Sequence, residues 1–163
     1  MNNLAVQEAT YLEVYKEEKD LFLPVDLVDG FGKVHKLEDW LRTKEVVEWK
    51  TNHYFSDGVY TRETFVPAGA IITGYRHKQK TVSLLTKGII SVIGVDELGY
   101  AKDYGTLEAP LTFVTEPKIK KVGLTHEDTI FLNAFCITAI PEEYHNIEHI
   151  DMIEEFIFYK DEV

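Results

Sequence analysis

The residues best suited to chemistry lie on one extended stretch, from Tyr60 to Val92. If this stretch forms strands, every second side chain points to the same side. One such face carries Thr73, Tyr75, His77, Gln79, Thr81, Ser83 and Leu85. This mixture is too polar for an ordinary core, whereas a ligand pocket combines apolar walls with a few placed polar groups. The pattern therefore predicts that this face lines a pocket.

Two basic residues define the chemistry that such a pocket would have. His77 can anchor a ligand or act as a general base, helped by Tyr75, because an imidazole titrates near neutral pH. Arg62 joins them if the adjacent strand points it inward, and a guanidinium binds carboxylate or phosphate through paired hydrogen bonds. The alternative for His77 is a buried neutral imidazole that is satisfied by a backbone group. The sequence agrees with both interpretations.

Short strands separated by turn residues make up the middle of the chain. The first begins at Val46, in VVEWKTNHYF. The other predicted strands are 59–66, 71–77, 82–85, 89–95, 111–115, 120–124 and 129–137. Turn residues such as Asp57-Gly58, Pro67 and Gly88 stand in the gaps. This spacing is typical of a β-sandwich or barrel rather than of a sheet with crossover helices.

The two ends of the chain differ from this middle part. Residues 1–20 fit a weak amphipathic helix or an arm, 21–37 short extended pieces with turns, and 37–41 one or two helical turns. Asn146 is a good N-cap for a helix whose stripe is Ile147, Ile150, Ile153 and Ile157. We expect an N-terminal arm over 1–45, a barrel over 46–138, and a helical tail over 139–163 that packs on the barrel or on a second subunit.

Composition and charge limit the partners. The 163 residues fit one domain with a sizeable core, and the net charge of −11 repels phosphate backbones and anionic membranes. We therefore expect no nucleic-acid or membrane partner. The lone Cys136 lies in an apolar run and predicts a buried thiol, and the chain has no long apolar span, so a soluble cytoplasmic protein is expected. Lys118, Lys120 and Lys121 form a basic run that predicts a solvated hairpin face.

The run from Asn52 to Phe135 resembles the cupin superfamily, in particular small single-domain cupin-like proteins often encoded by bacteriophages. The resembling pieces are HYFSDGVYTRETFVPAGAIITGYRHK, SLLTKGIISV, APLTFVTEPKIKKVG and LTHEDTIFLNAF. The resemblance covers about half of the chain. It implies an all-β fold, the double-stranded β-helix or jelly roll, around one small pocket, here with short helical segments at both ends. Many of these relatives are homodimers, and a homodimer is expected here.

Cupins commonly bind a divalent metal through histidines, and the resemblance places His77 at the first of them. The further histidines would fall at Gln79 or Thr81 and at Phe135. With two or three ligands missing, one imidazole would hold a transition metal poorly. We therefore expect no metal and no cofactor. His145 and His149, four residues apart, are two surface histidines in this interpretation.

The sequence leaves three functions open. The first is a non-catalytic cupin-like protein that binds a small polar or anionic molecule through Arg62, Tyr75, His77, Gln79, Thr81 and Asn133. In a phage, acting in the host cytoplasm, such a protein would sequester a host metabolite or signalling nucleotide. The second is a phage structural or interaction protein with a filled barrel. The third is a metal-free isomerase or epimerase with His77 as base and Tyr75 as acid.

Overall fold

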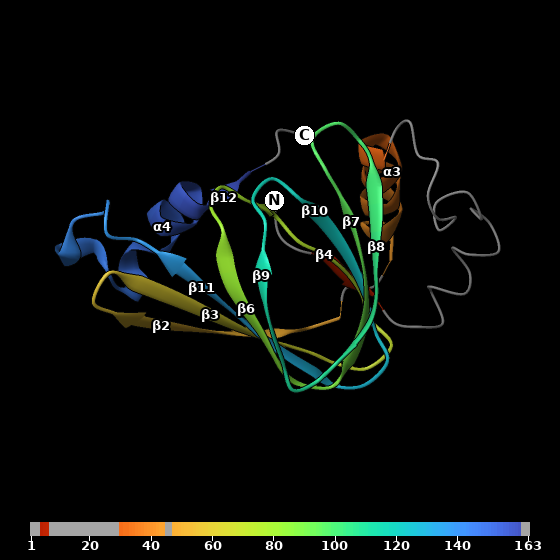
Figure 1. Cartoon of the computed structure of the whole chain (residues 1–163), viewed down its shortest axis with the longest axis horizontal. Helices are drawn as coiled ribbons and strands as arrows, with labels where there is room; N and C mark the ends of the chain where they lie inside the picture. Colours follow the sequence, from red (N-terminus) through yellow and green to blue (C-terminus); the bar gives the residue numbers. More distant parts are fainter. Residues whose placement is uncertain (1–3, 7–29, 45–46, 161–163) are drawn as a thin grey trace.

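Two antiparallel sheets face each other in the computed structural model, which describes residues 4–6, 30–44 and 47–160 (Figure 1). One sheet has the strand order β1-β4-β10-β7-β8 and the other β2-β3-β11-β6-β9. Their bounds are β1 Leu4–Val6, β2 Lys50–Ser56, β3 Val59–Val66, β4 Ile71–Thr73, β6 Thr81–Lys87, β7 Ile89–Val95, β8 Ala101–Glu108, β9 Leu111–Thr115, β10 Lys120–Thr125 and β11 Thr129–Cys136. A third, two-stranded sheet pairs β5 (Arg76–His77) with β12 (Phe158–Tyr159).

The strand pairing is that of a jelly roll. Eight strands pair from the outside inward as β3 with β11, β4 with β10, β6 with β9, and β7 with β8. This is one long hairpin, and rolling it up adds the contacts β11 with β6 and β10 with β7. The two remaining strands of these two sheets, β1 and β2, extend them at β4 and β3. The expected all-β jelly roll is confirmed.

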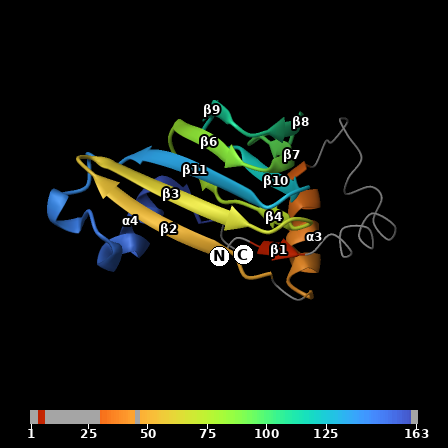
Figure 2. The same ribbon diagram turned by 90° about the horizontal axis from the view of Figure 1, so that it is seen from below.

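Helix α3 (Gly30–Leu41) covers the outer face of the first sheet, beside β4 and β10 (Figures 1 and 2). Leu37 and Leu41 are buried there against Ile71, because residues three and four apart share one helical face. The prediction of extended pieces up to residue 37 was wrong for residues 30–37. The sequence reading took Gly30 and Gly32 as turn signals and missed the apolar stripe that begins at Val34.

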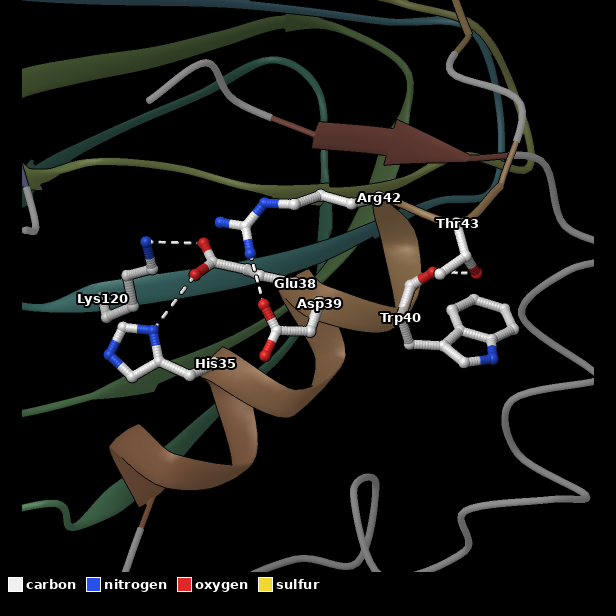
Figure 3. A network of polar contacts seen from close by, with 7 residues as sticks. All are labelled: His35, Glu38, Asp39, Trp40, Arg42, Thr43 and Lys120. Atoms are coloured by element: carbon white, nitrogen blue, oxygen red, sulfur yellow. Dashed lines mark hydrogen bonds and ion pairs between the residues drawn. The ribbon is translucent and has the colours of Figure 1, made fainter. Parts of the chain in front are cut away.

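A buried ion pair joins α3 to the sheet (Figure 3). Lys120 Nζ lies 2.7 Å from Glu38 Oε1, and both side chains are almost fully buried. His35 Nδ1 lies 3.4 Å from the other carboxylate oxygen of Glu38. The exposed side of the helix carries a second pair, Asp39 with Arg42. Lys120 is therefore not part of the solvated face that the sequence predicted.

Helix α4 (Ile150–Ile157) closes one end of the second sheet (Figure 1). Ile153 and Ile157 are fully buried against Tyr60 and Phe135, so this part of the predicted stripe packs on the barrel. The helix begins at Ile150 rather than after Asn146, and Ile147 is exposed. Asn146 caps a short 3-10 turn, η2 (Ile147–His149), by accepting a hydrogen bond from the Glu148 backbone N–H. Another 3-10 turn, η1 (Glu142–Tyr144), precedes it.

Other details of the sequence prediction need correction. The predicted strand 71–77 is interrupted at Gly74 and Tyr75 and gives two strands, β4 and β5. Strand β8 was missed because AKDYGTLE is polar and lies at a sheet edge, where most of its side chains stay exposed. Cys136 is exposed, not buried. The weak helix or arm expected over residues 1–20 falls mostly outside the described residues. In the described part, no helix has the length and apolar character needed to cross a membrane.

Candidate ligand site in the barrel

The barrel encloses a cavity of about 390 Å³, lined by side chains of both sheets. Its walls are mostly apolar and include Trp49, Ile72, Leu85, Ile90, Val92, Leu107, Leu111, Phe113, Ile119, Phe131 and Phe158. Gly123 helps to keep this space open, since a Cβ there would lie 2.9 Å from Ile90 and 3.1 Å from Ile72. This volume and composition match the usual small-molecule pocket, which holds about 300–1,000 Å³.

A row of polar side chains crosses the second sheet and faces the cavity. Arg62 on β3, Asn133 on β11 and Ser83 on β6 stand opposite one another in register. The Ser83 hydroxyl lies 2.7 Å from Asn133 Oδ1 and 2.8 Å from the Thr115 hydroxyl. Hydrogen bonding between neighbouring strands therefore fixes the Asn133 amide beside Arg62.

Arg62 is held from one side only. Its Nη1 lies 3.6 Å from Glu154 Oε1 on α4, and its guanidinium carbon lies 5.6 Å from the centre of the Phe158 ring. Its Nε, in contrast, is buried without a hydrogen-bond partner among the described residues. A buried N–H without an acceptor costs about 1–3 kcal/mol, more for a charged group. An acceptor atom supplied by a ligand would remove that cost.

His77 lies between aromatic rings. The ring centres of Phe135 and Phe158 are 5.0 Å and 5.5 Å from that of His77. Its Nδ1 is buried and, within the described chain, has no hydrogen-bond partner, so the backbone-satisfied alternative does not hold for this atom. Burial, together with the charges of Lys121 and Arg62, lowers the pKa of His77 to about 3. The imidazole is therefore neutral at pH 7 and a weak base.

Lys121 lines the same cavity from the first sheet. Burial lowers its pKa to about 8. No ion pair or hydrogen bond joins its amine to another described residue, whereas the neighbouring Lys120 points to the opposite face and pairs with Glu38. Two adjacent residues of a strand point to opposite faces, which explains the different surroundings. Lys121 was missed from the sequence because the basic run was assigned to the surface as a whole.

Four of the six residues predicted from the sequence line the cavity, namely Arg62, Tyr75, His77 and Asn133. Gln79 does not, because its side-chain amide bonds the backbone N–H and C=O of Cys136, at 3.1 Å and 2.9 Å. Thr81 is buried outside the lining, and its hydroxyl donates to the Gln79 backbone oxygen. The alternation fails at Gln79 because residues 78–80 separate β5 from β6. Thr81 keeps the parity of Ser83 and Leu85 in β6 but is not part of the cavity lining.

The side chains around His77 do not fit a metal ion. The resemblance placed a later histidine at Phe135, and this residue does lie next to His77, but as an aromatic ring. Among the described residues, no group of three histidine, cysteine or carboxylate side chains is placed to bind a metal. His145 and His149 have other partners: His145 Nε2 lies 2.8 Å from the Ile140 oxygen, and His149 Nδ1 lies 2.9 Å from Asn146 Oδ1.

Phe158 is the main contact residue that the sequence did not reveal. Strand β12 pairs with β5 so that Phe158 stands opposite His77, and its ring also packs on Tyr75 and Phe135. Only the pairing of the tail with a two-residue strand brings it to the cavity. Trp49, another aromatic residue that was not predicted to line the cavity, directly precedes β2. The sequence predicted a strand from Val46, whereas the strand begins at Lys50.

Several solved structures have a partly similar arrangement. An acetylacetone dioxygenase from Acinetobacter johnsonii aligns at 20% identity and a TM-score of 0.42, over 54% of this chain and 59% of that chain. A hydroxypropylphosphonic acid epoxidase from S. wedmorenis aligns at 12% identity and a TM-score of 0.45, over 56% and 53%. An oxalate oxidase aligns at 14% identity and a TM-score of 0.43, over 55% and 51%.

This chain therefore spans between a half and three fifths of the length of these three enzymes. No protein-family model and no curated protein sequence matches the chain. The fold assignment follows from the strand pairing of this chain, and the activities named above are those of the aligned proteins.

Proposed function

We propose that the barrel binds a small organic anion with an apolar body, without turning it over. The observation that carries this proposal is the pair of buried nitrogens without hydrogen-bond partners, Arg62 Nε and His77 Nδ1, on residues that line an open cavity. A carboxylate oxygen accepts a strong, charge-assisted hydrogen bond from a guanidinium. The apolar walls would bury the rest of the ligand and contribute about 25 cal/mol for each Å² removed from water.

The charges of the cavity support an anion rather than a cation. Arg62, Lys102 and Lys121 line it, against the single carboxylate of Glu116, which pairs with Lys80 at 3.1 Å. In a chain with a net charge of −11, a basic interior is a local exception. A cavity of one sign with low-dielectric walls concentrates counter-ions, so it would favour anions over the neutral molecules that the same walls admit.

Two features support binding without catalysis: the lowered pKa of His77 and the lack of metal-binding side chains around it among the described residues. An imidazole with a pKa of about 3 accepts a proton poorly, which argues against the isomerase alternative with His77 as base. The side chains around it do not fit a metal ion, so no step is assigned to one. Sequestration of a host metabolite by a phage-encoded protein is the biological setting that the resemblance suggests, and we include it in the proposal.

The test is a thermal-shift screen of aliphatic and aromatic carboxylates, sugar phosphates and nucleotides, followed by titration calorimetry of any compound that stabilises the protein. Arg62→Ala should weaken binding by about 1.5–3 kcal/mol, the value of a hydrogen bond to a charged group. Arg76→Ala is the matched control, because Arg76 packs over the Tyr159 ring and does not line the cavity. The proposal fails if no compound binds, or if Arg62→Ala binds every ligand as tightly as the wild type does.

An interaction role is the second candidate, favoured by the outer face of the second sheet. Val82 and Val114 stand opposite each other there and are 47% and 58% exposed. The described side chains leave a cavity in the barrel, so the interaction role is proposed here without the filled barrel that the sequence analysis gave it. We propose that this face joins two copies of the chain, and light scattering should give the mass of a dimer at micromolar concentration. A monomer mass would remove this candidate.

A further inference from the structure

Lys121 is the cavity residue that anion binding explains least. A lysine that serves only as a positive charge keeps a high pKa and works best beside a carboxylate or at the surface. Lys121 instead lines the mostly apolar cavity, where burial lowers the pKa of its amine, and no described residue supplies an acceptor to it. Directly opposite it in register is Gly94, and the space above this glycine is taken by the side chains of Tyr104 and Ile119. The side chain of Lys121 is half-buried there, so protein atoms replace part of the water around it.

We propose that Lys121 captures the carbonyl group of an oxo acid as a reversible imine, while Arg62 binds the carboxylate of the same molecule. This inference rests on the proposed anion site and names its ligand class: a small aldehyde or keto acid with an apolar body. Lys121 and Arg62 lie on opposite sheets and both line the cavity, and the charges of both act on His77, so the two groups share one interior.

The reaction needs no reagent beyond the two partners. Nζ in its neutral form attacks the carbonyl carbon, and a C–N bond forms. The C–O bond then breaks, and the oxygen leaves as water with the two hydrogens of the amine. Nothing is oxidised or reduced, and hydrolysis reverses the step. Imine capture is therefore compatible with a protein that holds its ligand without converting it.

The environment favours the neutral amine. With a pKa of about 8, roughly a tenth of Lys121 is neutral at pH 7, against less than about a thousandth of a lysine with the ordinary pKa of about 10.4. The other titratable groups that line the cavity are Arg62, Tyr75, His77, Lys102, Tyr104 and Glu116. Of these, only Glu116 carries a negative charge at neutral pH, and it pairs with Lys80. Desolvated lysines of this kind are the usual nucleophiles in imine chemistry.

The experiment uses 4-carboxybenzaldehyde as probe, with sodium cyanoborohydride to reduce any imine to a stable secondary amine. Intact mass spectrometry should show one adduct on the wild type, and peptide mapping should place it on Lys121. Lys121→Arg should lose the adduct. Lys87→Arg, which changes an exposed lysine at the end of β6, should keep it. Arg62→Ala and the carboxylate-free probe benzaldehyde should each slow trapping by about tenfold to a hundredfold, as expected for a lost charged hydrogen bond.

A carbonyl-free analogue, 4-(hydroxymethyl)benzoate, separates the two proposals. If it binds the wild type and Lys121→Arg, but the aldehyde gives no adduct, anion binding stands and the imine is overturned. If the adduct forms on Lys121 at the same rate in Arg62→Ala, and the analogue does not bind, then Lys121 is reactive but the anion site fails. Adducts spread over several lysines and unchanged in Lys121→Arg overturn the role of Lys121. Circular dichroism of each variant checks that the fold is retained.

Discussion

Lys120 and Lys121 are neighbours in sequence, and strand β10 directs them to opposite sides of the sheet. Lys120 is buried under α3 with the carboxylate of Glu38 at 2.7 Å. Lys121 lines the cavity with no such partner among the described residues. A buried charge is tolerated in a structural position when a countercharge accompanies it. Lys121 is half-buried without a countercharge, in a cavity that Arg62 and His77 also line with unsatisfied nitrogens, so the missing partner is expected to come from a ligand.

The largest effect expected from this comparison is on the paired side. Glu38→Ala removes the carboxylate from a buried ammonium and should lower the free energy of unfolding by about 3–5 kcal/mol. Chemical denaturation monitored by circular dichroism measures this change. Replacing both partners, Glu38→Leu with Lys120→Met, should recover most of the loss, because no charge is then buried. If Glu38→Ala costs less than 1 kcal/mol, the contrast between the two faces disappears.

An opposite and smaller effect is expected on the cavity side. Lys121→Met removes a charge that the folded protein holds unfavourably, and should raise the free energy of unfolding at pH 7 by about 1–3 kcal/mol. The folded pKa of about 8 lies below the unfolded value, so between pH 8 and about 10.4 the unfolded chain binds more protons. Wild-type stability should therefore rise with pH in that window relative to Lys121→Met. Denaturation curves of both proteins at pH 7 and 9.5 test this. A difference in free energy of unfolding between them that is the same at both pH values would contradict it.

The smallest effect concerns the exposed pair on the same helix as Glu38. Asp39 and Arg42 are joined near the surface (Figure 3). Exposed pairs contribute roughly 0.2–1 kcal/mol, so Asp39→Ala should lower the free energy of unfolding by no more than that. Addition of salt should reduce the difference further. If Asp39→Ala lowers the free energy of unfolding as much as Glu38→Ala does, the packing of α3 on the sheet, rather than burial of the charge, determines both results.

The sequence predicted the fold better than it predicted the site. Period-two patterns located β3, β7 and β9 at their observed bounds, since these strands have both apolar alternation and clear turns at their ends. The side of the sheet to which each side chain points was harder to predict than the position of the strands. Alternation from Ser83 back to Tyr75 assumes an unbroken strand, and the bend at residues 78–80 takes Gln79 to the Cys136 backbone instead. Lys121 and Phe158 reach the cavity only through long-range pairing, which local patterns do not encode.

The pairing of the outermost strands has a consequence for how the barrel assembles. Strands β7 and β8 are close in sequence and can form a hairpin early, whereas β3 and β11 are separated by nearly all of the barrel. Closing so long a loop costs entropy that only the final contacts offset, so non-local pairing of this kind folds slowly. Arg62 and Asn133 meet across this last pair. A bound ligand would therefore act only on chains that have completed the roll, and would slow their unfolding without speeding their folding.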